Sequence, residues 1–143
     1  MSFYEKFKTD PALEVEKGIT LDYGDSGKIV IHRAGGSNKR FVRAMESKMK
    51  PYRFQIQQGT LDEEVAARVL AEVYADAVIV GWSGVKDEAG KEMAFSRENV
   101  IKLLTDIPEL FRDIQQQANL VSNFRAEAKE ADAKNSAASS AGN

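Results

Sequence analysis

The first regular pattern along the chain is an alternation of apolar and polar residues near the N-terminus. Ile19, Leu21 and Tyr23 fall on one face of an extended segment, and the turn sequence GDSG follows at residues 24–27. Residues 29–31 then form a run of β-branched side chains. Alternation, a glycine-bearing turn and β-branched residues are together typical of two antiparallel strands. The pattern therefore predicts an N-terminal β-hairpin.

The hydrophobic spacing then changes from two residues to four, which indicates a helix. Phe41, Met45 and Met49 lie four residues apart. Ser37 is a plausible N-cap before them, and Pro51 ends the segment. We expect a basic amphipathic helix with a narrow apolar face.

The clearest helix begins at residues 60–63, where a threonine and a glutamate three positions apart fit a capping box. Val65, Val69 and Val73 then recur every fourth residue, and other apolar residues beside them widen the face. We expect this helix to lie at the centre of the core and to end near Gly81.

Two further helices are expected toward the C-terminus. The first begins at Ser96, an N-cap, and stops before Pro108. The second has Pro108 in its first turn and runs to about Ala131, longer than the average globular helix of about 11–12 residues. Its apolar positions approach a heptad pattern. We name them the C-terminal seam: Leu110, Ile114, Ala118, Val121 and Phe124.

The C-terminal seam has two interpretations. Its first half is expected to pack on the helix of residues 65–77 in the same chain. Beyond Asn119 a partner is favoured, because a long helix with a narrow seam tends to pair with another helix. The C-terminal seam is therefore the leading candidate for a partner-binding surface.

These elements predict an α+β fold that is predominantly α-helical, with an N-terminal β-hairpin followed by a small helical bundle and a long C-terminal helix. Residues 1–17 support no more than an N-terminal arm or a short helix. Residues 18–130 are expected to form a single globular, mainly helical domain. Residues 131–143 contain no large apolar side chain and are expected to be a disordered tail.

Charge is distributed unevenly along the 143 residues. The net charge is -2, yet residues 28–53 hold eight Lys and Arg against the single acid Glu46. Such asymmetry fits either the phosphates of a nucleic acid or an acidic face of another subunit, and the sequence does not choose between them. The candidate basic interface consists of Lys39, Arg40, Arg43, Lys48, Lys50 and Arg53.

The residues of ordinary catalytic and metal sites are few. The chain has no cysteine, and its single histidine, His32, cannot anchor a usual zinc site or catalytic triad. Carboxylates recur at residues 62–64 and 87–88, but each group has a helix-start or turn explanation. The stretch AGGSNKR, residues 34–40, fits a turn and cap better than an anion site. We therefore expect no enzyme, no metal site and no cofactor.

The stretch GWSGVKDEAGKEMAF, residues 81–95, places a tryptophan among glycines and charges. Trp82 just past a helix end fits a structural anchor that packs the loop on the core, and Phe95 is assigned the same role. The alternative is an exposed aromatic residue for ligand stacking. We favour the anchor, because large aromatic side chains are mostly buried.

Three stretches stand in a characteristic order: GGSNKRFVRAMESKMKPY, then ADAVIVGWSGV, then AGKEMAFSRENVIKLLTDIPELFRDIQQQANLVSNF with an Ala/Glu/Lys tail. Their most specific parts are Gly-Trp followed by a turn, Phe-Ser-x-Glu-Asn, and Leu-Leu-x-Asp-x-Pro-x-Leu-Phe. From about Asp10 to Asn135, the chain resembles the tail assembly chaperones of long-tailed bacteriophages.

This resemblance implies a non-enzymatic protein that binds the tape measure protein, keeps it soluble and extended, and helps recruit tail tube subunits. It would act in the host cell cytoplasm and be absent from the finished virion, and no membrane contact is expected. Many such families also make a longer, frameshifted product whose extra domain contacts the tail tube protein, and the codons of residues 133–135 are a candidate slippery run. A homo-oligomer formed through the basic interface is a further hypothesis. The alternative is a small nucleic-acid-binding protein that uses residues 28–53.

Overall fold

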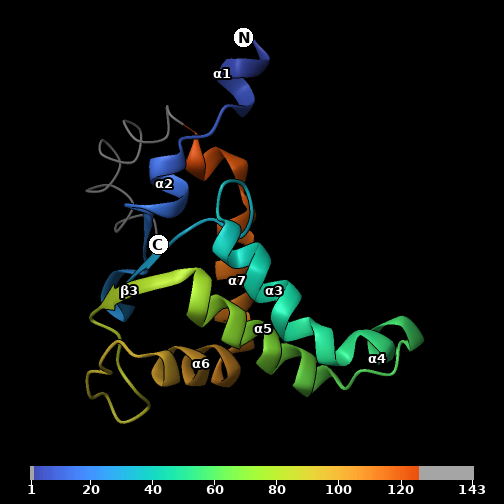
Figure 1. Ribbon diagram of the computed structural model, residues 1–143. Helices are drawn as coiled ribbons and strands as arrows, with labels where there is room; N and C mark the ends of the chain where they lie inside the picture. Colours follow the sequence, from blue (N-terminus) through green and yellow to red (C-terminus); the bar gives the residue numbers. More distant parts are fainter. Residues whose placement is uncertain (1, 126–143) are drawn as a thin grey trace.

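The computed structural model describes residues 2–125 and shows an α+β fold that is mainly helical, as predicted. A helical arm projects from a body that is built around a three-stranded sheet (Figure 1). A short N-terminal helix extends from another end of the body, at the top of the view. The strands are β1 (Ile19–Asp22), β2 (Lys28–Ile31) and β3 (Ile79–Ser83). The helices are α1 (Phe3–Phe7), α2 (Pro11–Val15), α3 (Lys39–Met49), α4 (Arg53–Gln58), α5 (Glu63–Ala77), α6 (Arg97–Asp106) and α7 (Pro108–Asn119), with short 3₁₀ turns η1 (Gly24–Ser26), η2 (Lys50–Tyr52) and η3 (Val121–Phe124).

The sheet confirms the predicted hairpin and adds a strand that the sequence pattern does not predict. β1 pairs antiparallel with β2, with Ile19 opposite Ile31. The expected central helix ends at Ala77 instead of near Gly81, and the following residues form β3, which pairs antiparallel with β2 and places Trp82 opposite Ile29. A short apolar run such as residues 78–80 suits a strand as well as the end of a helix. These residues form a strand because they pair with the open edge of β2.

The core is centred on the aromatic ring of Tyr74, in the last turn of α5. This ring meets Phe41 of α3 edge-on at a centroid distance of 6.0 Å and Phe111 of α7 at 5.1 Å. Edge-to-face pairs at such distances stabilise beyond the area that they bury. Burial raises the pKa of Tyr74 to about 12, as expected for a phenol enclosed in the core. Tyr74 therefore holds together the arm, the central helix and the last helix.

The loop between β2 and α3, residues 32–38, joins four parts of the molecule, and we name it the junction loop. The backbone N–H of Arg33 donates to the carbonyl of Glu14 in α2 at 3.0 Å, and that of Ala34 donates to the carbonyl of Ala118 in α7 at 2.9 Å. The side chain of Asn38 donates to the carbonyl of Ala77, at the end of α5, at 2.8 Å. The loop therefore holds β2, α2, α5 and α7 together at the base of the arm.

Glu14 supplies the junction loop with a buried carboxylate. Its side chain accepts hydrogen bonds from the Arg33 guanidinium at 2.6 Å and from the Ser37 hydroxyl at 2.7 Å. Burial favours the neutral acid, but these hydrogen bonds outweigh it and hold the pKa of Glu14 below its usual value. The carboxylate also packs against Gly36, where a Cβ atom would collide with it and where φ is +55°. The glycine-rich stretch, residues 34–40, therefore forms a turn and a helix start, as the sequence predicts. The anion that contacts it is the chain's own Glu14 carboxylate.

Two helix caps differ from the predicted ones by one or two residues. Asn38 caps α3 in place of Ser37 and accepts a hydrogen bond from the Phe41 N–H at 3.3 Å, because the Ser37 hydroxyl is used by Glu14. The capping box at Thr60 does not form. Asp62 caps α5 through the Glu64 N–H at 2.8 Å, while the Thr60 N–H donates to the carbonyl at residue 55.

The last helix ends at Asn119, not near Ala131 as the heptad-like pattern suggests. Leu120 is extended and the chain turns back, so that the Asp10 N–H donates to the Phe124 carbonyl at 2.7 Å. After this turn the Phe124 ring is completely buried in the core, which stabilises the turned-back path. The tail at residues 131–143 and the predicted end of the helix lie outside the described residues.

Replacing Asn38 by alanine tests the junction loop. Asn38→Ala removes the cap of α3 and leaves the carbonyls of Arg33 and Ala77 without this donor in buried surroundings. We expect a loss of about 2–3 kcal/mol in the free energy of unfolding, measured by chemical denaturation. Gln116→Ala, which removes an exposed amide from α7, is the control and should change it by less than about 0.5 kcal/mol. Equal losses for the two variants would contradict this role of Asn38.

The Glu14 carboxylate predicts a loss of stability in acid. Its folded-state pKa lies below the usual value of 4.5, so its contribution is fully present above that pH and is lost as the pH falls through the folded-state pKa. The free energy of unfolding of the wild type should therefore fall more steeply below pH 4.5 than that of Glu14→Gln. Denaturant titrations at a series of pH values measure both slopes. Parallel slopes would show that Glu14 is not held ionised in the fold.

Candidate partner-binding surfaces

The C-terminal seam lies inside the protein, not on its surface. Ile114, Ala118 and Phe124 are fully buried in the core cluster, while Leu110 and Val121 are partly exposed at its edge. For its first half, this is the packing within the chain that the sequence favours; beyond Asn119, where a partner is expected, the burial of Phe124 corrects the prediction. The cause is that α7 and η3 pack against the chain's own body, with the Arg33 guanidinium 6.0 Å from the centroid of the Phe124 ring. In this fold the seam is not available to a partner.

The helical arm, residues 39–58 with the facing part of α5, is the most prominent projection of the structure (Figure 1). α3 packs along α5, and α4 lies at the outer end of the arm, away from the sheet. Lys39, Arg43 and Lys50 follow one another at helical spacings of four and seven residues and are all exposed. The inner face of α3 carries Phe41 and Met45, which are half-buried. The outer face of the arm is therefore mainly basic, with the exposed Glu46 as an acid among these cations.

The charges of the candidate basic interface are mostly unpaired. Lys48 is the exception, since it lies 4.0 Å from the Glu72 carboxylate of α5. The other basic residues of the segment do not all join this surface: Arg33 is paired with Glu14, and Lys28 lies on β2. Within residues 2–125, five exposed cations of the arm make no salt bridge: Lys39, Arg40, Arg43, Lys50 and Arg53.

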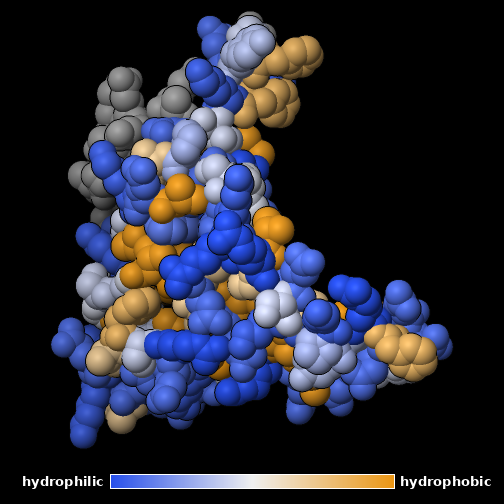
Figure 2. Space-filling view, viewed as in Figure 1, coloured by the Kyte–Doolittle hydropathy of each residue, from blue (hydrophilic) through white to orange (hydrophobic). Residues whose placement is uncertain are grey.

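The outer end of the arm also exposes large apolar side chains. Phe54 is 71% and Ile56 47% exposed, and both lie on α4. Figure 2 shows hydrophobic atoms at this end of the arm, surrounded by hydrophilic ones. We name Arg53, Phe54 and Ile56 the arm tip. The sequence pattern does not predict it, although Gly59 with its left-handed backbone marks where α4 ends.

A second exposed apolar surface lies on α1. Phe3 and Tyr4 are each 80% exposed and Phe7 57%, and the rings of the two phenylalanines are 6.3 Å apart. The spacing of positions 3, 4 and 7 puts the three rings on one side of the helix, which we name the aromatic face of α1. Figure 2 shows hydrophobic atoms, beside more hydrophilic ones, at the far N-terminal end of the molecule. The capping box of Ser2 and Glu5, which starts this helix, is the sequence signal that could have revealed it.

Trp82 and Phe95 lie together where β3 leads into the loop before α6. The two rings meet edge-on with centroids 5.4 Å apart, and the indole N–H of Trp82 donates to the carbonyl of Met93 at 2.9 Å. Trp82 is half-buried and Phe95 more exposed. Within the loop, Lys86 and Glu92 form an isolated antiparallel β-bridge. These contacts tie the loop to the sheet.

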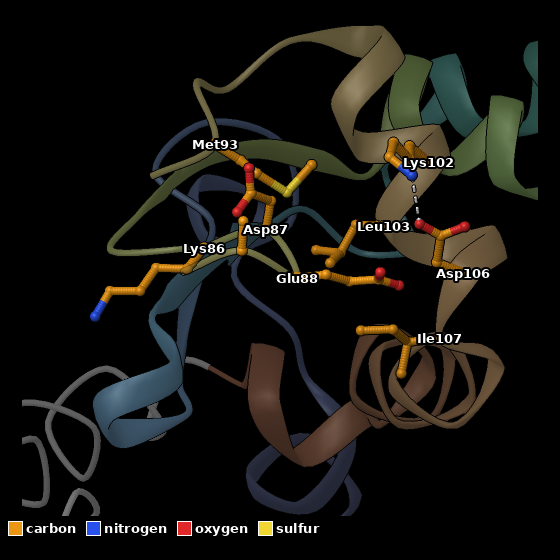
Figure 3. A pocket seen from close by; sticks show the side chains of 9 residues that line it. Lys86, Asp87, Glu88, Met93, Lys102, Leu103, Asp106 and Ile107 are labelled. Carbon is orange, nitrogen blue, oxygen red and sulfur yellow. Dashed lines mark hydrogen bonds and ion pairs between the residues drawn. The ribbon is translucent and has the colours of Figure 1, made fainter. Parts of the chain in front are cut away.

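A pocket of about 300 Å³ lies between this loop and the end of α6 (Figure 3). We name it the loop pocket. Met93, Leu103 and Ile107 supply its apolar surface, and Asp87, Glu88 and Asp106 supply carboxylates. Lys102 is hydrogen-bonded to Asp106 at 2.7 Å, whereas the side chain of Lys86 points away from the pocket (Figure 3). The pocket is thus apolar with an acidic rim.

The part of the chain described here holds no cluster of three or more His, Asp or Glu suited to a metal ion. His32 lies in the junction loop, where its Nε2 is 3.1 Å from the carbonyl of Glu16. Among the described helices none is long and apolar enough to cross a membrane. Among the described residues, the arm, α1 and the loop pocket each bring exposed apolar side chains close to charged ones.

Comparison with known proteins gives one family. A family model described as a YdaY prophage protein matches residues 36–135, which include the arm, β3, the loop pocket and α7. α1 and the hairpin of β1 and β2 precede the matched region. No curated protein and no solved structure matches the chain. Because the family model covers more than half of the sequence, this chain belongs to the YdaY family of prophage proteins.

Proposed function

We propose that this protein is a phage tail assembly chaperone. It binds the tape measure protein in the host cell cytoplasm, keeps it soluble and helps recruit tail tube subunits, without catalysing a reaction. Membership of a prophage protein family supports a role in the life cycle of a phage. The order of the sequence motifs, which resembles that of tail assembly chaperones, supports the more specific role.

The observation that carries this proposal is the aromatic face of α1. Phe3, Tyr4 and Phe7 make few contacts with the rest of the chain and are among its most exposed apolar residues. Contiguous exposed apolar groups on a soluble protein commonly mark a site of interaction with another protein. Aromatic residues are also enriched among the residues that contribute most to binding.

The chemistry of the proposed partner suits this face. A tape measure protein is a long helix-rich chain whose apolar seams are exposed before the tail assembles. An amphipathic helix such as α1 can pack on such a seam, with Phe3 and Phe7 one turn apart as its anchors. The contact is assigned to α1 instead of the C-terminal seam, because α7 uses its apolar side chains within the core.

α1 is free to make this contact without disturbing the fold. It extends away from the body (Figure 1), and none of its residues is buried. Its cap is internal to the helix: Ser2 and Glu5 each accept a hydrogen bond from the other's backbone. Substitutions on its aromatic face should therefore leave the core intact.

Co-expression with the tape measure protein of the same prophage tests the proposal. The wild-type chain should yield a soluble complex, whereas the variant Phe3→Ser/Tyr4→Ser/Phe7→Ser should not. Burial of an aromatic side chain is worth about 1.5–3 kcal/mol, so the loss of three should weaken binding by at least about 100-fold. Soluble yield and copurification are the measurements.

The control removes exposed apolar side chains from elsewhere on the surface. Val42→Ser/Val80→Ser/Leu120→Ser changes three such residues on the arm, β3 and the end of α7, and should leave the complex unchanged. A wild-type chain that leaves the tape measure protein insoluble would overturn the proposed function. A complex that survives in the α1 variant and not in the control would move the contact away from α1.

A further inference from the structure

The arm tip and the loop pocket have complementary shapes and charges, although they lie on different parts of the chain. The arm tip projects an aromatic ring beside an unpaired cation, and the loop pocket is an apolar hollow with an acidic rim. We propose that the arm tip of one copy inserts into the loop pocket of a second copy, so that the protein associates head to tail.

The size of the pocket suits the side chain of Phe54. A closed cavity of about 150 Å³ already holds a benzene ring, and the loop pocket measures about 300 Å³. Met93, Leu103 and Ile107 line the space that a ring would enter (Figure 3). Transfer of the 71% exposed Phe54 into this space removes its ring from water.

The charges of the two surfaces are opposite. Glu88 points toward Asp106 and Ile107 at the pocket (Figure 3) and makes no hydrogen bond or salt bridge within residues 2–125. Asp87 uses a side-chain oxygen to accept the Lys91 N–H, which keeps this carboxylate at the rim. The hydrogen bond to Asp106, with a smaller effect of the charges of Glu88 and Asp87, raises the pKa of Lys102. The rim of the pocket therefore carries more negative than positive charge, which favours the binding of a cation there.

The arm tip supplies that cation. Arg53 immediately precedes Phe54 and, like Lys50 one turn earlier, is exposed and makes no salt bridge in the described part of the chain. A guanidinium beside an inserted ring can pair with Glu88 at the rim, because Arg suits interface ion pairs with carboxylates. Ring insertion would then give most of the affinity, and the ion pair would give orientation.

A second copy fits this contact better than the same chain. α3 packs along α5 and holds the arm out from the body, so the tip of a chain lies apart from its own loop and α6 (Figure 1). A contact between two different surfaces of identical chains is heterologous, and it continues into rings or filaments. A contact of this limited area should be weak on its own. If the proposed function holds, binding of neighbouring copies along a tape measure protein would strengthen the head-to-tail contact. The contact itself does not depend on that function.

The test uses sedimentation velocity of the purified full chain over a range of concentrations. The wild type should form species larger than a dimer as its concentration rises. Arg53→Glu and Glu88→Arg should each weaken self-association at least about tenfold, which corresponds to 1.4 kcal/mol. The double variant Arg53→Glu/Glu88→Arg should restore it, since the ion pair is then reversed. Arg40→Glu, an exposed arginine of the arm outside the tip, is the matched control and should behave as the wild type.

A mixing experiment distinguishes head-to-tail contact from a symmetric one. Phe54→Ser removes the ring but keeps the pocket, and Glu88→Arg disables the pocket but keeps the tip. Each variant alone should associate at least about tenfold more weakly than the wild type. At concentrations where both are monomeric, their mixture should form a dimer that joins one intact tip to one intact pocket and should stop there. A wild-type chain that stays monomeric up to about 1 mM, or single variants that associate as the wild type does, would overturn the proposal.

Discussion

The structure depends on one buried carboxylate, that of Glu14. It draws the guanidinium of Arg33 and the hydroxyl of Ser37 into the junction loop, where only a glycine at position 36 leaves room for it. The backbone of the same loop bonds to α2 and α7, and Asn38 bonds to the end of α5. An ion pair in such a setting is costly to break, because either partner alone would be a buried charge. The loop thereby fixes the direction in which the arm leaves the body.

This arrangement decides which apolar surfaces remain for partners. With α7 held against the body, the Tyr74 ring is enclosed between Phe41 and Phe111, and the C-terminal seam is used up in the core. Among the described residues, the most exposed aromatic side chains lie on the outlying helices α1 and α4, away from the core. A protein organised in this way can present two contact surfaces without loss of stability. One of them suits a helical partner, and the other suits a second copy of the chain.

The sequence predicts those elements whose pattern is local. Alternation predicts the hairpin, and fourfold spacing predicts α3 and α5, because each element shows its buried face in its own residues. The sequence does not predict β3, since the run around Ile79 becomes a strand only through pairing with β2. The heptad-like seam favours packing of Ile114 within the chain, as observed, but it does not reveal that Phe124 is buried in the same core. The candidate sites share this limit: the basic interface is visible as composition, but the loop pocket forms only when residues 86–93 meet the end of α6.

We propose that partners bind to the outlying helices, while α7 belongs to the core. Hydrogen exchange of the protein, alone and in complex with the tape measure protein, tests it most directly. In the free protein the amides of α7 should exchange slowly and those of α1 rapidly, since α1 buries none of its residues. In the complex, new protection should appear at residues 3–7 and α7 should stay unchanged. If the amides of α7 exchange rapidly in the free protein and become protected only in the complex, then α7 binds the partner and does not belong to the core.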